Sequence, residues 1–254
     1  SLVRPAKKSY PNVCTFSEKV ASLPLVHQPG EKWTYSIGMD ILGCVIERAS
    51  GVTFGTFLEE NIFGPLGMTD TFFEVPESKQ DRMIDLYGHK KSFKEFGVEL
   101  PKNLGDKKLI LLDPKEDSFF FQEASIEDGG SGLVSTARDY LKFAKMLLNE
   151  GSLKGTTILR PETVKIMTSN QVEKKAKPNR FDAFGQGVTV GIALNAKKMR
   201  MQRGNNSFFW GGAARTMFWV DTKNDLIFVN MSQVLGSPRI NNKVEKLVYK
   251  TLGL

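Results

Sequence analysis

The stretch SFFWGGAARTMFWVDTKNDLIFVNMSQ, residues 207–233, decides the fold because runs of strand-forming residues alternate in it with turn residues. Ser207–Gly212, Arg215–Asp221 and Leu226–Ser232 are rich in aromatic and β-branched residues, so each is predicted to be a strand. Thr-Lys-Asn-Asp at 222–225 has the composition of a hairpin turn. The last two strands are therefore expected to be antiparallel neighbours.

The segments before this stretch are mostly helical, and one helix follows it. Apolar residues at helical spacing predict helices over 36–50 and 241–252. Thr136 is placed to cap a third helix that ends at Gly151. Phe184–Leu194 is predicted to be a further strand. The pattern predicts an α+β fold, with an antiparallel sheet flanked by helices and a mostly helical region beside it.

Two regions are expected along the chain. Residues 1–180 are predicted to form the helical region, and residues 181–254 to carry the strands and the closing helix. Within the first region, residues 74–128 are polar, rich in lysine and interrupted by prolines, which predicts a long irregular excursion. Loops of this length inside compact domains are usually functional, so the excursion is expected to form a wall of a binding site.

The composition argues against a transmembrane protein and against a nucleic-acid-binding protein. No window of the 254 residues holds 18 uninterrupted apolar residues, so no transmembrane helix is expected. The net charge is +7, and the basic residues concentrate in Lys174–Arg180 and Lys197–Arg203. No zinc-finger, RRM or helix-turn-helix pattern accompanies these runs. They are interpreted as solvated loops, and no nucleic-acid partner is expected.

Cysteine and histidine usage argues against a metal centre. The chain has two cysteines, Cys14 and Cys44, and two histidines, His27 and His89, and their scatter fits no metal-ligand spacing. Neither a metal nor an organic cofactor is expected. Cys44 lies in an apolar helical run and is interpreted as a small core residue, while a single disulfide stays open. The cellular compartment is therefore undecided.

Two segments could carry chemistry. Trp33-Thr34-Tyr35-Ser36-Ile37 places Tyr35 at a loop-to-helix junction, where the competing interpretation is an aromatic residue packed on the core. A catalytic tyrosine needs neighbouring cations that lower its phenol pKa from about 10. Trp210-Gly211-Gly212-Ala213 places two glycines in a β-rich segment. It could be a β-bulge, or a strand edge whose N–H groups bind a substrate carbonyl.

A third segment, Gly129-Gly130-Ser131-Gly132-Leu133, resembles the G-x-S-x-G elbow of α/β-hydrolases. Leu133 stands where the elbow needs glycine, and the strand expected before the elbow is weak. Ser131 is therefore disfavoured as a nucleophile. A phosphate-binding loop is no better supported, because no Lys-Ser or Lys-Thr pair follows the glycines.

Together these segments resemble, in order and separation, the serine β-lactamase-like superfamily of class C β-lactamases, D,D-peptidases and family VIII carboxylesterases. The resemblance runs from about Thr15 to Gln233 and rests on four blocks. They are LPLVHQPGEKWTYSIGMDILGCVIERASG, IFGPLGMTDT, DGGSGLVSTARDYLKFAKMLLNEG with ILRPETVKIMTSNQV, and FFWGGAARTMFWVDTKNDLIFVNMSQ.

The resemblance implies a serine hydrolase that forms an acyl-enzyme. Tyr35-Ser36-Ile37 matches the family's Tyr-x-Asn motif, which makes Tyr35 the general base or proton relay. Trp210-Gly211-Gly212 matches the third motif of the family. The next residue, Ala213, would offer its N–H to the oxyanion hole. The residues implied to line the substrate are Trp210, Gly211, Gly212 and Ile37.

The family's nucleophile motif, Ser-x-x-Lys, is absent, because no serine here has a lysine three positions later. The motif is expected upstream of Ser1, so the chain is expected to be a fragment that is inactive alone. Loss of an N-terminal block would expose an edge of strand 226–232. The missing segment, a second copy or local disorder is expected to account for that edge. The competing interpretation is a chain that evolved without the nucleophile into a non-catalytic binding module.

Two departures from the family pattern bear on the substrate. Trp210 supplies an apolar face without charge, where lactamases of this family usually meet a carboxylate with a cationic or polar residue. Ile37 replaces the amide that would hold a side-chain carbonyl. The expected activity is therefore a carboxylesterase acting on small neutral esters, with β-lactamase or D,D-peptidase activity as the alternative.

Overall fold

The computed structural model describes residues 10–89, 109–122, 124, 126–173, 176, 182–236 and 241–254. The structure divides into two compact units. Unit 1 comprises residues 1–25, 35–139 and 232–237; unit 2 comprises residues 26–34, 140–231 and 238–254. The basic run Lys174–Arg180, apart from Ala176, lies outside the described residues. The mixture of helices and antiparallel strands confirms the predicted α+β class.

Two helices of unit 1 begin at a residue whose side chain caps them. Thr53 accepts the N–H of Thr56 at the start of the second helical run, and Asn12 accepts the N–H of Thr15 in the same way. Gly51 ends the preceding helix with a φ of 78°, a backbone conformation that favours glycine. The helices are α2 (Val13–Ala21), α3 (Gly38–Ser50), α4 (Phe54–Leu58) and α5 (Gly64–Leu66), with a π-helical turn at Glu59–Phe63.

The described part of the excursion contains short strands and 3₁₀ turns. Strand β1 (Leu86–His89) pairs antiparallel with β2 (Leu109–Asp113) and parallel with β10 (Val234–Leu235), which gives a three-stranded sheet in the order β10-β1-β2. The 3₁₀ turns are Glu77–Arg82, Lys115–Asp117 and Phe119–Phe121. The predicted domain boundary at residue 180 stays a prediction.

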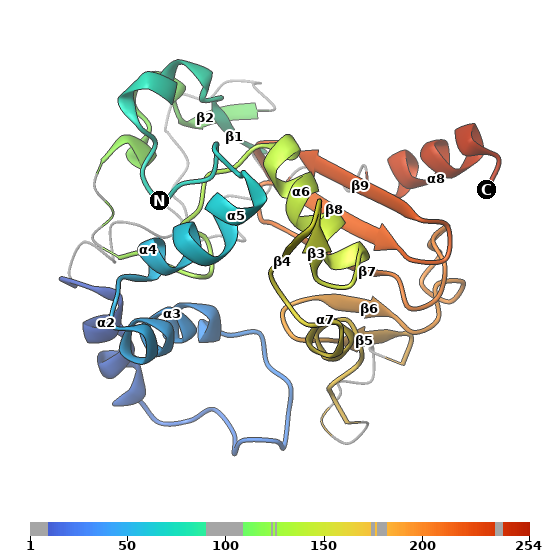
Figure 1. Ribbon diagram of the computed structural model, residues 1–254, viewed down its shortest axis with the longest axis horizontal. Helices are drawn as coiled ribbons and strands as arrows, with labels where there is room; N and C mark the ends of the chain where they lie inside the picture. Colours follow the sequence, from blue (N-terminus) through green and yellow to red (C-terminus); the bar gives the residue numbers. More distant parts are fainter. Residues whose placement is uncertain are drawn as a thin grey trace. The chain divides into compact units, whose positions relative to one another are not determined.

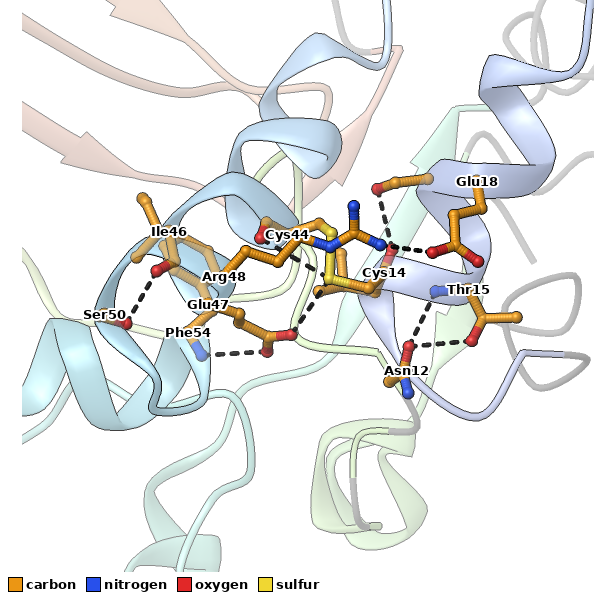
Figure 2. Close-up of a disulfide and its surroundings, with 12 residues drawn as sticks. Asn12, Cys14, Thr15, Glu18, Cys44, Ile46, Glu47, Arg48, Ser50 and Phe54 are labelled. Atoms are coloured by element: carbon orange, nitrogen blue, oxygen red, sulfur yellow. Dashed lines mark hydrogen bonds and ion pairs between the residues drawn. A yellow bond between two sulfur atoms is a disulfide. The ribbon is translucent and has the colours of Figure 1, made fainter.

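The two cysteines are joined in a disulfide, which answers the question that the sequence left open. Cys14 on α2 and Cys44 on α3 have Cα atoms 4.8 Å apart, and Figure 2 shows the bond between the two helices. An ion pair between Arg48 and Glu18 joins the same helices beside it. Cys44 is also buried, beside Val13 and Ile126. The interpretation of Cys44 as a core residue is therefore confirmed, with a covalent partner added.

Unit 2 is built on a five-stranded antiparallel sheet in the order β5-β6-β7-β8-β9 (Figure 1). Its strands are β5 (Phe184–Gln186), β6 (Gly191–Ala193), β7 (Phe208–Gly211), β8 (Thr216–Asp221) and β9 (Leu226–Met231). The prediction of one strand over 184–194 is wrong. The chain turns between β5 and β6, where Thr189 has a φ of 71°, and the two halves pair with each other.

Helices pack against this sheet through aromatic side chains. Helix α6 (Ala137–Leu148) enters unit 2 at Tyr140, whose ring centroid lies 5.0 Å from that of Phe218 on β8. Thr136 caps α6 as predicted, since its hydroxyl accepts the N–H of Asp139. The remaining elements are α7 (Pro161–Met167), α8 (Asn241–Leu252) and a small hairpin of β3 (Ser152–Leu153) and β4 (Thr156–Thr157).

None of the described helices is, by itself, both long and apolar enough to cross a bilayer. By length and composition, α3 together with Phe54–Leu66 would qualify only as a pair, bent by 81°.

Candidate functional site

Tyr35 lies in the loop that leads into α3, in unit 1. Its side chain is 74% exposed, and Ile37, the N-cap residue of α3, is 45% exposed. The loop is held locally, because the Ser36 hydroxyl accepts the N–H of Gly38 at 3.1 Å. The Ile37 carbonyl accepts the N–H of Asp40 at 3.0 Å. These bonds fix the backbone on which the predicted general base and Ile37 are carried.

Helix α3, which carries this loop, is anchored at its first turn by a contact from a distant segment. The buried carboxylate of Asp40 accepts the N–H of Gly130 at 2.9 Å. Gly129 packs so closely on the Met39 carbonyl that a Cβ at position 129 would overlap it. Further along, the disulfide ties Cys44 to α2. The helix that follows the Tyr35 loop is thus held by a carboxylate, a glycine contact and a covalent bond.

Ser131 has a structural environment in the glycine-rich loop. Its N–H and its hydroxyl both donate to Oδ1 of Asp128, at 2.6 and 3.1 Å. The Asp128 carbonyl accepts the N–H of Gly132, where a Cβ would overlap Phe73. The Asp128 side chain thus takes the place of a backbone acceptor in this loop.

The second predicted motif lies at the end of β7, in unit 2. Trp210 pairs with Phe218 and Gly211 with Met217 in the ladder to β8. Gly212 continues the ladder, donating its N–H to the Thr216 carbonyl at 2.8 Å. The Thr216 hydroxyl lies so close that a Cβ on Gly212 would overlap it. A larger residue at position 212 would therefore require the Thr216 hydroxyl to move.

The chain then reverses in a β-turn over residues 212–215. The Gly212 carbonyl accepts the N–H of Arg215 at 3.1 Å, which closes the turn. Ala213 is the second residue of the turn, a position whose N–H takes no part in the closing bond. Ala213 is exposed, and none of the hydrogen bonds found among the described residues uses its N–H. This geometry suits a donor to a substrate oxyanion.

Asn230 holds this turn from the neighbouring strand, and the sequence interpretation missed it. Its side-chain amide on β9 donates to the Arg215 carbonyl at 3.0 Å. Arg215 itself has a φ of 66°, an unfavourable conformation for a residue with a Cβ, which neighbouring contacts must maintain. The available signal was a lone amide inside the apolar run LIFVNM.

The structure brings Trp210, Gly211, Gly212 and Ala213 together with Asn230 within unit 2. Tyr35 and Ile37 belong to unit 1. The placement of one unit against the other is not determined, so the convergence of the two motifs stays a prediction. Among the described residues, no group of three His, Cys, Asp or Glu side chains could hold a metal ion.

A protein-family model described as Beta-lactamase matches residues 4–251. The chain belongs to the Beta-lactamase family. The family includes serine hydrolases and acyltransferases, so the chain is part of an enzyme family with the β-lactamase fold. The antiparallel sheet, the flanking helices and the order of the motifs fit that membership.

Relatives within the family include hydrolases. Protein Rv1367c of Mycobacterium tuberculosis is 29% identical over 92% of this chain and 61% of its own length. Lovastatin esterase of Penicillium rubens is 28% identical over 86% of this chain and 54% of its own length. The solved structure of EstCE1, a hydrolase with promiscuous acyltransferase activity, superposes with a TM-score of 0.75 at 22% identity. The match covers 94% of this chain and 61% of EstCE1. This chain therefore spans less than two thirds of the length of each of these three proteins.

Proposed function

We propose that the intact protein is a carboxylesterase that acts on small neutral esters through an acyl-enzyme. Its nucleophilic serine lies outside these 254 residues, and the chain alone is inactive. The observation that carries the proposal is the β-turn at 212–215, which leaves the Ala213 N–H out of the turn's hydrogen bonds directly after the half-buried Trp210. A donor for a developing oxyanion thus follows an uncharged aromatic surface.

The proposed reaction has two acyl-transfer steps. Tyr35 accepts the proton of the serine hydroxyl as the serine oxygen attacks the ester carbonyl. The carbonyl oxygen becomes an oxyanion and accepts hydrogen bonds from the N–H of Ala213 and from that of the serine. The C–O bond to the alcohol then breaks, and the alcohol leaves with the proton from Tyr35. Water attacks the acyl-enzyme in the same way and releases the carboxylic acid.

The preference for neutral esters rests on what the site residues lack. Trp210 presents a ring and one N–H donor, and Ile37 presents an aliphatic side chain that is 45% exposed. Neither side chain can compensate the carboxylate that a β-lactam carries. The name of one relative, lovastatin esterase, supports an ester substrate.

Strand β9 lies at one edge of the five-stranded sheet, which is relevant to the proposal that the chain is a fragment. Within the described residues β9 pairs only with β8, so its other edge carries backbone groups without a strand neighbour. Such edges associate readily with further strands. The segment of the intact protein that carries the serine, or a second copy of the chain, is proposed to cover this edge.

The test compares two substrates on the full-length gene product. We expect kcat/KM for p-nitrophenyl butyrate to exceed that for nitrocefin by about 100-fold or more, a difference in transition-state stabilisation of about 3 kcal/mol. The 254-residue chain is expected to hydrolyse neither substrate. Faster turnover of nitrocefin would replace the esterase proposal with a β-lactamase. A native gene without Ser-x-x-Lys, whose product turns over neither, would favour the non-catalytic binding module.

A further inference from the structure

A cavity of about 700 Å³ lies in unit 2, formed by segments that are far apart in the sequence. The loop 196–205 supplies most of its lining. The turn between β8 and β9 adds Lys223 and Asn224, and helix α8 adds Lys246. None of the residues of the proposed esterase site lines this cavity. Its volume is in the range of pockets that bind small molecules.

The lining of the cavity is strongly cationic. Lys197 and Arg200 come from the loop, and Lys223 and Lys246 come from the other two segments. Arg203 adds a fifth cation, and none of the described residues that line the cavity is acidic. Lys197, Lys198 and Arg200 are exposed, which agrees with the prediction of a solvated loop. The fold also brings most of the loop's charge together with two lysines from elsewhere in the chain.

Arg203 is the one lining cation that is buried, with 3% of its surface exposed. Its Nη2 donates to Glu245 at 3.3 Å, and its guanidinium stacks over Phe209 and Trp219, at 4.5 and 4.9 Å from the ring centroids. Nε and Nη1 are buried and find no hydrogen-bond partner among the described residues. Because these two atoms are buried, Arg203 contributes positive charge to the wall of the cavity and no accessible donor.

Two carboxylates near the cavity, those of Glu245 and Asp221, form hydrogen bonds that hold the loop 196–205 in place. Oε1 of Glu245 accepts the N–H groups of Gln202 and Arg203, at 2.8 and 3.2 Å. Asp221 accepts the N–H of Gly204 at 3.1 Å and the Tyr249 hydroxyl at 2.6 Å. Burial opposes ionisation of Asp221, but these hydrogen bonds outweigh it and lower its pKa. The loop is therefore fixed by internal acceptors, while the cations of the rim stay available.

We propose that this cavity binds a small anion that carries two or more phosphate groups. Four rim cations on three segments can contact several phosphates at once, and Arg203 adds a buried guanidinium to the wall. A single carboxylate would leave most of these charges without a partner. The ligand can be a free polyphosphate or the headgroup of a phosphoinositide, since both present the same chemistry. This inference does not depend on the esterase proposal.

The test is calorimetric titration of the full-length protein with inorganic tripolyphosphate at about 0.15 M salt, where long-range charge effects are screened. We expect saturable 1:1 binding with a Kd below about 100 µM, and weaker binding of orthophosphate. Lys197→Ala and Lys246→Ala are each expected to weaken binding by about tenfold, the loss of one charge-assisted contact. Both lysines are exposed, so the buried Arg203–Glu245 pair stays intact.

The matched control is Lys165→Ala on α7, an exposed lysine outside the cavity, which is expected to leave the Kd unchanged. Equal weakening by this control, or no saturable binding, would overturn the proposal. So would tighter binding of single-stranded RNA than of tripolyphosphate. Vesicles with and without phosphatidylinositol bisphosphate, compared with free inositol trisphosphate, identify the source. Preference for the vesicles indicates a lipid headgroup, and equal affinity indicates a soluble ligand.

Discussion

The two halves of the proposed esterase site are held in place by different means. Trp210–Ala213 continues a strand of a five-stranded sheet, and its turn is fixed by ladder hydrogen bonds and by Asn230. Tyr35 is 74% exposed and lies on the loop before α3. That helix is held by the hydrogen bond of Asp40 to Gly130 and by the Cys14–Cys44 disulfide. The oxyanion donor is thus built into the sheet, whereas the base depends on contacts several residues away from it.

The largest expected effect comes from removing the phenol oxygen. Tyr35→Phe in the full-length protein should lower kcat for p-nitrophenyl butyrate by about 10²–10⁴-fold, the usual contribution of a positioned base. The melting temperature should not change, because the side chain is largely exposed. Steady-state kinetics and thermal denaturation measure the two quantities.

Tyr87→Phe is the matched control for this substitution, because it removes a phenol oxygen of unit 1 whose hydroxyl donates to Asp85, away from the proposed site residues. Its kcat should equal that of the wild type. Unchanged kcat in Tyr35→Phe would exclude Tyr35 as the base. The proposed site would then lack its half in unit 1.

The Cys14–Cys44 disulfide is expected to stabilise unit 1, which carries Tyr35. Replacing both Cys14 and Cys44 by serine opens a cross-link with a sequence separation of 30 residues. Loop entropy then predicts a loss of about 3.6 kcal/mol in the free energy of unfolding. Denaturant titration with and without reductant measures it. Reductant should lower the stability of the wild type and leave the double variant unchanged. A wild type insensitive to reductant would contradict this role.

The turn at the oxyanion half should respond to Asn230→Ala. The substitution removes the amide that holds the Arg215 carbonyl, so kcat should fall about tenfold while KM stays within twofold, because only positioning is lost. Stability should fall by about 1 kcal/mol, the net value of one hydrogen bond. A loss of stability without the kcat effect would make Asn230 a purely structural residue.

The smallest effect concerns acid sensitivity in unit 1. Hydrogen bonds from Arg82 and Lys79 hold the pKa of Asp70 well below its usual range. A carboxylate with a lowered folded pKa stabilises the fold above its unfolded pKa of about 4, and this contribution is lost as pH falls further. Arg82→Ala should therefore lower the melting temperature slightly at pH 7, and the difference should narrow below about pH 4. A difference that widens in acid would contradict the assignment.

Local sequence signals predicted most of the elements. Thr136 caps its helix, and the turn at 222–225 joins β8 to β9, because each signal lies within a few residues of its effect. The single strand over 184–194 failed because an apolar run cannot distinguish one strand from a tight hairpin whose turn needs a φ of 71° at Thr189.

Other features depend on residues distant in the sequence. Asp40 meets Gly130 across 90 positions, and Lys246 joins Lys197 and Lys223 around one cavity. Asn230 supports a turn 15 residues away. No periodicity or short motif records such contacts. The residue types of the candidate site could be named from the sequence, whereas the side chains that position them required the fold.

The central claim is that Tyr35 and Ala213 face one acylated serine. The most direct measurement is a crystal structure of the full-length protein inactivated by a p-nitrophenyl alkylphosphonate. We expect a phosphonyl oxygen within about 3 Å of the Ala213 nitrogen, and the Tyr35 hydroxyl within about 3.2 Å of the serine oxygen. A phosphonylated serine with Tyr35 or Ala213 more than about 10 Å away would contradict the claim.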